Sequence, residues 1–138
     1  MPTLGDVLGF SNRWYALAVN TARDLTLPSG TAIRVITAPA FVATKLEAFA
    51  GRGGGDHLFS HDLSDVISVI DGRDELLVEV LQAPTVLQTY LVRQMSALLA
   101  TRAFRDSLPG HLPADAASQA RLPDLLARMQ RLAQQREP

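Results

Sequence analysis

The sequence has 138 residues, a size typical of one domain, and its 47% hydrophobic and 20% charged residues indicate a globular protein. It contains no cysteine, which excludes disulfides and thiolate metal sites. The formal net charge is −1, from 13 basic and 14 acidic residues. Proteins that bind nucleic acid mainly through its phosphates carry a basic excess, so we predict no strong nucleic-acid binding.

The sequence has the features of neither a membrane-spanning nor an exported protein. No apolar run approaches the ~20 residues that cross a bilayer, and the first residues lack the basic and apolar regions of a signal peptide. We therefore expect a cytoplasmic protein with no membrane partner.

The first third of the chain predicts a short helix followed by a β-hairpin. Ser11 is a suitable N-cap for a helix over about residues 12–22. Two short extended runs follow, Arg23–Leu27 and Thr31–Ile36, and Pro28-Ser29-Gly30 between them favours a tight turn. A two-stranded hairpin is marginal on its own and has two open edges. We expect a helix, a second copy of the chain or additional strands to cover those edges.

The remainder of the chain predicts helices separated by glycine, proline and capping residues. They are expected from Pro39 to about Ala50, from Ser60 or His61 to Asp71, from about Arg73 through Leu81, from Pro84 to about Ser107, briefly after Asp115, and from Pro123 onwards. The predicted fold is α+β and mostly α: a short antiparallel β-hairpin packed against a bundle of about six helices. We expect one domain over 1–138, with a sheet region at 1–38 and a helical region at 39–138.

Lys45 is the single lysine in the sequence and the first candidate site residue. On a helix it shares a face with Phe41, Ala48 and Phe49, which predicts a stem partly covered by apolar neighbours. An ammonium group held at the edge of a core can bind a phosphate or a carboxylate. The alternative is a lysine that extends to solvent and pairs with an acidic residue elsewhere.

Asp62 and Asp65 are three residues apart in the first turns of a predicted helix. The helix dipole stabilises carboxylates there by roughly 0.3–1 kcal/mol each, which is a sufficient structural reason for them. Two such carboxylates could also contribute to a metal site, but His61 beside them lacks the spacing of a zinc motif. We predict no metal site from these residues alone.

Arg52-Gly53-Gly54-Gly55 resembles a phosphate-binding loop only superficially, because it follows a helix and has no Gly-Lys-Ser/Thr ending. We interpret it as a flexible linker from which Arg52 could reach an anion near Lys45. Nucleophilic catalysis has little support, since there is no cysteine and no Gly-x-Ser-x-Gly turn. The three histidines are far apart in the sequence and are interpreted as loop or capping residues: His57, His61 and His111.

Two motifs together resemble the later motifs of the AbiEii/AbiGii-type nucleotidyltransferases, a family that includes toxins of bacterial toxin–antitoxin systems. They are Ala43-Thr44-Lys45-Leu46-Glu47-Ala48-Phe49 followed by Arg52, and Ser60-His61-Asp62-Leu63-Ser64-Asp65 followed by Asp71-Gly72-Arg73. The segments Leu8–Tyr15 and Leu108–Pro113 are similar to one bacterial branch of the family. The resemblance covers nearly the whole chain.

The resemblance implies that Lys45, with Arg52 near it, contacts nucleotide phosphates, and that Asp62 and Asp65 support this site. It also implies nucleotide and Mg²⁺ as cofactors of intact relatives. Those enzymes hold metal ions with a Gly-Ser turn, an Asp-x-Asp pair and a third carboxylate, and two divalent ions neutralise the phosphates. This sequence contains no Gly-Ser dipeptide and no Asp-x-Asp pair. We assign it no catalytic or metal-binding residue.

We therefore expect a truncated or degenerate nucleotidyltransferase-like protein that is inactive alone and retains residual phosphate binding. The alternative is a non-catalytic helical interaction protein, or a partner that completes a separately encoded catalytic half. In both cases the hairpin edge is the expected contact surface for a homodimer or a partner protein.

Overall fold

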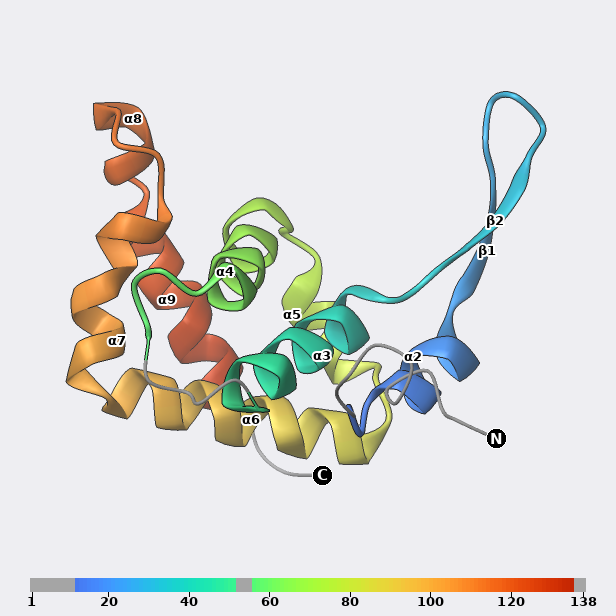
Figure 1. Ribbon diagram of the computed structural model, residues 1–138, viewed down its shortest axis with the longest axis horizontal. Coiled ribbons are helices and arrows are strands. Elements are labelled where there is room, and N and C mark those ends of the chain that lie inside the picture. The colour runs from blue at the N-terminus through green and yellow to red at the C-terminus, as the bar shows by residue number, and fades with distance from the viewer. Residues whose placement is uncertain (1–11, 52–55, 136–138) are drawn as a thin grey trace.

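The computed structural model describes residues 12–51 and 56–135 and has a helical bundle from which a two-stranded hairpin projects (Figure 1). Its architecture confirms the predicted α+β class. The elements in chain order are α2 (Tyr15–Thr21), β1 (Arg23–Thr26), β2 (Ala32–Val35), α3 (Ala38–Gly51), α4 (His61–Gly72), α5 (Leu76–Leu81), α6 (Thr85–Ala100), α7 (Arg102–Ser107), the 3₁₀ helix η1 (Leu108–His111), α8 (Ala116–Gln119) and α9 (Leu122–Ala133).

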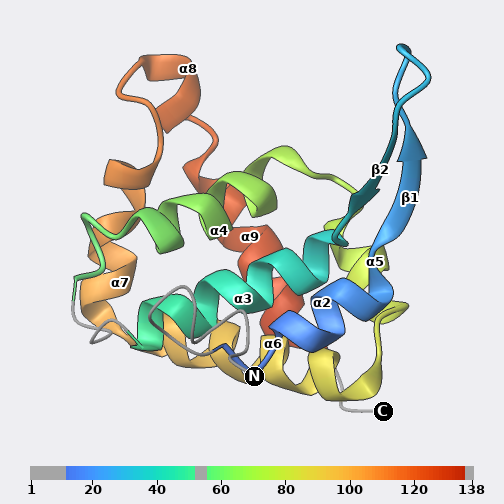
Figure 2. The same ribbon diagram turned by 45° about the vertical axis from the view of Figure 1, so that its right-hand side comes forward.

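The hairpin forms where the sequence predicts it. Strands β1 and β2 pair antiparallel, with Arg23 opposite Val35 and Thr26 opposite Ala32. Gly30 closes the turn with a φ of 87°, a left-handed conformation that glycine adopts without a steric penalty. Figure 2 shows both strands extending away from the helices, and every residue in them is exposed.

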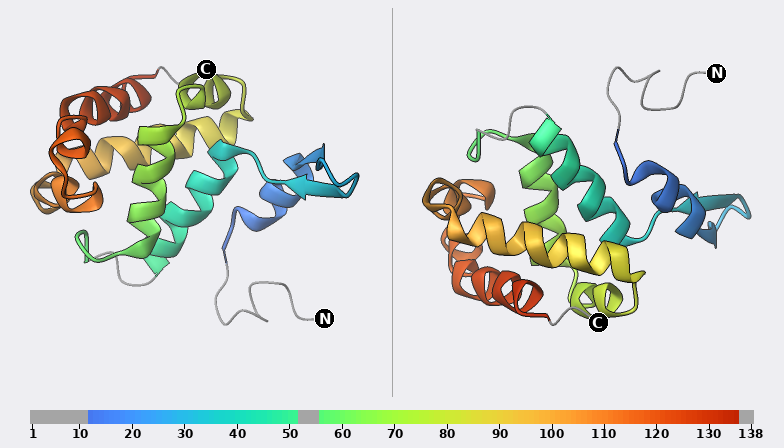
Figure 3. Two further views of the ribbon diagram at one scale, coloured as in Figure 1. Left: turned by 90° about the horizontal axis from the view of Figure 1, so that it is seen from above. Right: turned by 90° about the horizontal axis from the view of Figure 1, so that it is seen from below.

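The core lies among α3, α4, α6 and α9. Helix α6 runs along one side of the bundle, and both α3 and α9 pack against it (Figure 3). Helix α4 packs between α3 and α9. The largest fully buried side chains come from several of these helices and the adjoining turns: Phe104, Leu46, Leu63, Ile67, Ile70, Leu87, Met95, Leu108, Leu125 and Met129.

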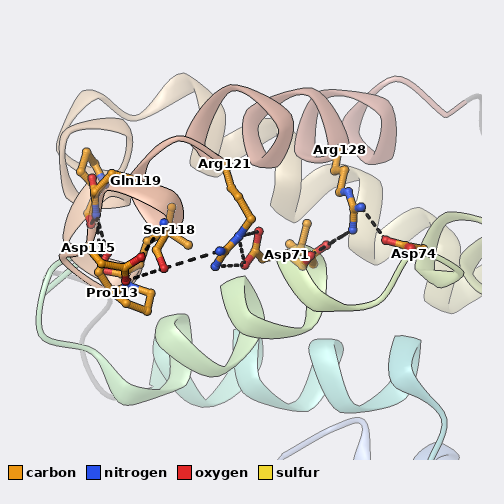
Figure 4. Close-up of polar contacts among 11 residues, drawn as sticks. Asp71, Asp74, Pro113, Asp115, Ser118, Gln119, Arg121 and Arg128 are labelled. Carbon is orange, nitrogen blue, oxygen red and sulfur yellow. Dashed lines mark hydrogen bonds and ion pairs between the residues drawn. The ribbon is translucent and has the colours of Figure 1, made fainter.

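Helix α4, which carries the two candidate aspartates, is fixed at both ends. The helix begins at His61, one of the two predicted starts, and the Ser60 hydroxyl caps it by accepting a hydrogen bond from the Leu63 backbone N–H at 3.2 Å. At the other end Arg128 of α9 donates to the carbonyls of Ile70 at 3.0 Å and Asp71 at 3.1 Å (Figure 4). A guanidinium satisfies these terminal carbonyls and complements the negative end of the helix dipole.

The predicted helix from Pro84 to about Ser107 is wrong in its continuity. The structure has two helices, α6 and α7, separated at Thr101, whose φ of −93° and ψ of 115° are those of extended backbone. The Thr101 hydroxyl donates to the Ala97 carbonyl at 2.8 Å, a local bond that competes with helix continuation. The break turns α7 away from the α6 axis (Figure 1). Phe104 of α7 is fully buried in the core.

Two other boundaries differ from the prediction. Helix α5 begins at Leu76 instead of near Arg73, because Arg73 is extended and its N–H caps α4 by donating to the Val69 carbonyl. Ser11, the expected N-cap of the first helix, lies outside the described residues. None of the described helices combines the length and apolar character needed to span a bilayer.

Candidate functional site

The structure places the Lys45 ammonium at the contact between α3 and α4. Its Nζ lies 2.9 Å from a carboxylate oxygen of Asp65 and 3.9 Å from one of Asp62. The same nitrogen lies 5.5 Å from the centre of the ring of Phe41, which is one turn earlier on α3. The predicted helix face of Lys45 is therefore confirmed, and three candidate residues from two helices meet at one point.

The two aspartates differ in their environment. The Asp62 side chain is 8% exposed, whereas that of Asp65 is 46% exposed and that of Lys45 is 31% exposed. Their spacing of three residues places both on the face of α4 that packs against α3. The ammonium is thus paired closely with an accessible carboxylate and lies 3.9 Å from a buried one.

The charge balance of this cluster limits what it can bind. One ammonium faces two carboxylates, so the formal charge of the three groups together is −1 when all are ionised. A phosphate that approached Lys45 would displace Asp65 or meet its repulsion. The arrangement matches the alternative interpretation of an ion-paired lysine, and it permits phosphate binding that is weak unless another cation contributes.

Arg52, the second cation expected at this site, lies outside the described residues. Within residues 12–51 and 56–135, no group of three or more histidine, aspartate or glutamate side chains could hold a metal ion. The ammonium lies where an ion bridging Asp62 and Asp65 would bind. The described residues therefore do not fit the Mg²⁺ site that the family resemblance implies.

A cleft of about 690 Å³ reaches Phe41, the neighbour of Lys45, although none of Lys45, Asp62 and Asp65 lines it. It lies between the base of the hairpin and helices α3, α4 and α5, and Phe41 is common to the cleft and to the lysine cluster. Its volume is in the range of small-molecule sites. The cleft is lined by Arg23, Asp24, Leu25, Val35, Ile36, Thr37, Ala38, Phe41, Ser68, Val69, Gly72, Arg73 and Glu79.

At the wall of this cleft Arg73 and Glu79 form a bidentate pair, with contacts of 2.5 Å and 3.0 Å. The Arg73 hydrogen bonds lower the pKa of Glu79 below its usual value. Burial opposes this shift and the charge of Arg73 adds to it. Because Arg73 and Glu79 neutralise each other, neither of them is an unpaired charge in the cleft.

The structure also brings together residues that the sequence analysis treated as separate. The His111 Nδ1 lies 2.8 Å from the Ser64 hydroxyl, and its Nε2 lies 2.5 Å from the His57 carbonyl oxygen. Because a carbonyl can only accept, Nε2 carries a proton, and in a neutral imidazole ring Nδ1 would then accept from the Ser64 hydroxyl. Their separations of 47 and 54 residues give no periodic signal, so spacing alone could not have revealed this contact.

The Ser64–His111 contact brings a serine hydroxyl next to an imidazole nitrogen, and the second bond of the same ring holds the backbone of His57. Its evident effect is structural, because it joins η1 to α4 and to the segment that precedes α4.

A comparison of the chain with protein-family models, curated proteins and solved structures finds no match in any of the three. The family resemblance therefore stays a prediction.

Proposed function

We propose that this chain is a nucleotidyltransferase-like protein of the AbiEii/AbiGii type that binds nucleotide phosphates weakly through Lys45 and does not transfer nucleotidyl groups on its own. The observation that supports the proposal is the meeting of Lys45, Asp62 and Asp65 beside a cleft. Residues of the two motifs that carry the resemblance thus meet in space, although Asp62 follows Lys45 by 17 positions in the sequence. A cytoplasmic location is part of the same proposal.

Lys45 is the residue that we propose to contact phosphate, and Arg52 is the proposed second contact. A single ammonium with two carboxylates nearby should give an affinity for ATP only in the range of about 1 mM or weaker, equivalent to about −4 kcal/mol. Asp62 holds the ammonium in place from a buried position, and Asp65 competes with the phosphate for it. The proposal therefore predicts opposite effects for changes at the ammonium and at the exposed carboxylate.

Titration of the purified chain with ATP, followed by NMR chemical shifts, tests this assignment. Lys45→Ala should weaken binding by about tenfold, because it removes the ammonium that we propose as the main phosphate contact. Asp65→Asn should strengthen binding by about twofold to fivefold, because it removes a competing charge. Arg102→Ala is the matched control: it removes one positive charge from an exposed ion pair on α7 and should leave binding unchanged.

If Lys45→Ala binds ATP as well as the unmodified chain, the lysine is not a phosphate contact and the proposal fails. The second part of the proposal has its own test. Incubation with labelled nucleotides, divalent cations and RNA or protein acceptors should give no incorporation, since the sequence has no Asp-x-Asp pair. Robust metal-dependent incorporation would contradict this part.

A second candidate function is that of a non-catalytic interaction protein, including one that completes a separately encoded catalytic half. The projecting hairpin favours it, because its apolar side chains are exposed. The test is a titration with a separately encoded protein that carries Gly-Ser and Asp-x-Asp motifs. Saturable binding that Ile33→Lys abolishes would support this function, whereas binding that Ile33→Lys leaves unchanged would place the contact elsewhere.

A further inference from the structure

The hairpin has one apolar face and one polar face. Directly opposed residues of two antiparallel strands lie on the same face. One face is largely apolar, because it carries the pair Leu25–Ile33 and, next to it, the pair Arg23–Val35. Its apolar side chains are exposed: Leu25 by 50%, Ile33 by 37% and Val35 by 42%. The other face carries Thr26 opposite Ala32 and an ion pair between Arg34 and Asp24 at 3.6 Å.

Both edges of the hairpin offer backbone groups for pairing. The Leu27 N–H donates to the Thr31 carbonyl at 2.8 Å, which makes this a hydrogen-bonded pair. From here toward the base of the hairpin, non-hydrogen-bonded and hydrogen-bonded pairs alternate. By this alternation the N–H and C=O groups of Ala32 and Arg34 point outward on β2, and those of Asp24 and Thr26 point outward on β1. In the described part of the chain the sheet is limited to these two strands, so neither edge is paired.

The two edges are not equally suited to pair with a copy of themselves. A two-fold pairing of β1 centred on Leu25 sets the charged Arg23 against Leu27 of the second copy on the apolar face. At its base this edge is already occupied, because Arg34 donates to the Ala22 carbonyl at 3.1 Å. Edge β1 is therefore the poorer template.

A two-fold pairing of β2 centred on Ile33 gives compatible neighbours throughout. Ile33 lies opposite Ile33 of the second copy, and Thr31 opposite Val35, on the apolar face. On the polar face Arg34 lies opposite Ala32, so no like charges are directly opposed, and Arg34 keeps its own Asp24. β-branched side chains opposite one another stabilise a sheet, and this strand supplies them in register.

We propose that the chain forms a symmetric dimer through the β2 edge, in which a second copy completes a four-stranded sheet of order β1-β2-β2-β1. The outward groups of Ala32 and Arg34 supply the hydrogen bonds across the two-fold axis. Val35 lines the cleft, so Thr31 of the second copy, opposite it, brings the tip of that hairpin to the edge of the cleft. The dimer uses the contact surface of the second candidate function and is independent of nucleotide binding.

The test measures the molar mass of the full chain across a concentration series by light scattering or sedimentation equilibrium. The unmodified chain should approach twice the 14.9 kDa of one copy. Ala32→Pro should remain monomeric, because proline lacks the N–H that the β2 edge donates. Thr26→Pro is the matched control, since it removes the equivalent outward N–H from β1 and should still dimerise.

Neither proline removes a hydrogen bond within the hairpin, because Thr26 opposite Ala32 is a non-hydrogen-bonded pair in this register. Circular dichroism of both variants should match the unmodified chain, and Ile33→Lys provides a second test of the interface without proline. A monomer at all concentrations would overturn the proposal. So would dimers that Thr26→Pro disrupts and Ala32→Pro does not, or open-ended oligomers in place of a closed pair.

Discussion

The helical bundle and the hairpin use the same kinds of residue in opposite ways. Ile67 of α4 is fully buried, whereas Ile33 of β2 is 37% exposed, although both lie in regular secondary structure with apolar neighbours in sequence. In the bundle several helices cover each apolar stripe, while the hairpin extends away from the helices (Figure 2) and its apolar side chains are exposed. The difference indicates that the bundle folds on its own contacts and that the hairpin face is available for binding.

The same substitution at the two isoleucines gives the largest effect that we predict. Ile67→Ala should lower the free energy of unfolding by about 2–5 kcal/mol, because it removes buried methyl groups and leaves a cavity. Ile33→Ala, the matched control in the hairpin, should lower it by less than about 1 kcal/mol, because less of its surface leaves water on folding. Urea unfolding of the dilute monomer measures both. Equal losses would contradict the division of the molecule into two regions.

The second prediction concerns the long-range contact that fixes helix α4. Arg128→Ala should lower the free energy of unfolding by about 1.5–3 kcal/mol, because a charged donor to two carbonyls is lost along with its pair to Asp74. Arg102→Ala removes an exposed i,i+4 pair and should change it by less than about 0.5 kcal/mol. If the two variants unfold alike, Arg128 does not fix the end of α4.

Much of the fold could be predicted from local signals. Ser60 lies at the start of its helix and Asp115 caps the next short one, as expected. The Asp115 carboxylate accepts from the Ser118 N–H at 3.0 Å and from the Ser118 hydroxyl at 2.7 Å (Figure 4). These hydrogen bonds to Ser118 hold the pKa of Asp115 below its usual value. Such caps depend on residues three positions apart, so they are visible in the sequence. The break at Thr101 accompanies the burial of Phe104 against distant parts of the chain, and no local sequence pattern predicts that packing.

The residues of the candidate site could be predicted from the sequence, but the ion pairs between them could not. Helical spacing places Lys45 over Phe41 and puts Asp62 and Asp65 on one face, as the structure confirms. That both carboxylates contact the lysine depends on how α3 and α4 pack, and the periodicity of either helix says nothing about it. For the same reason the contact between Ser64 and His111 could not be foreseen.

The third prediction tests a buried polar contact that stabilises the bundle. Tyr90 donates to the Glu47 carboxylate at 2.7 Å, and burial, reinforced by this hydrogen bond, raises the pKa of Tyr90 above its usual value. The folded state therefore keeps a proton that the unfolded state loses near pH 10, so the free energy of unfolding should fall as the pH rises past that value. Tyr90→Phe should cost about 1 kcal/mol at neutral pH and reduce this alkaline loss. An unchanged alkaline dependence in Tyr90→Phe would assign the loss to another group.

The smallest effects that we predict come from weakening one ion pair on the bundle and one on the hairpin. Asp65→Asn weakens a 2.9 Å pair on the bundle and should lower the free energy of unfolding by a few tenths of a kcal/mol, roughly 0.2–1. Asp24→Asn weakens a 3.6 Å pair on the hairpin, where both side chains are more than half exposed, and should have no measurable effect. Added salt should reduce the Asp65 effect toward zero, because screening weakens an exposed pair. A larger loss at Asp24 than at Asp65 would contradict the comparison, because it would mean that the exposed pair between the two strands contributes more to stability than the closer pair on the bundle.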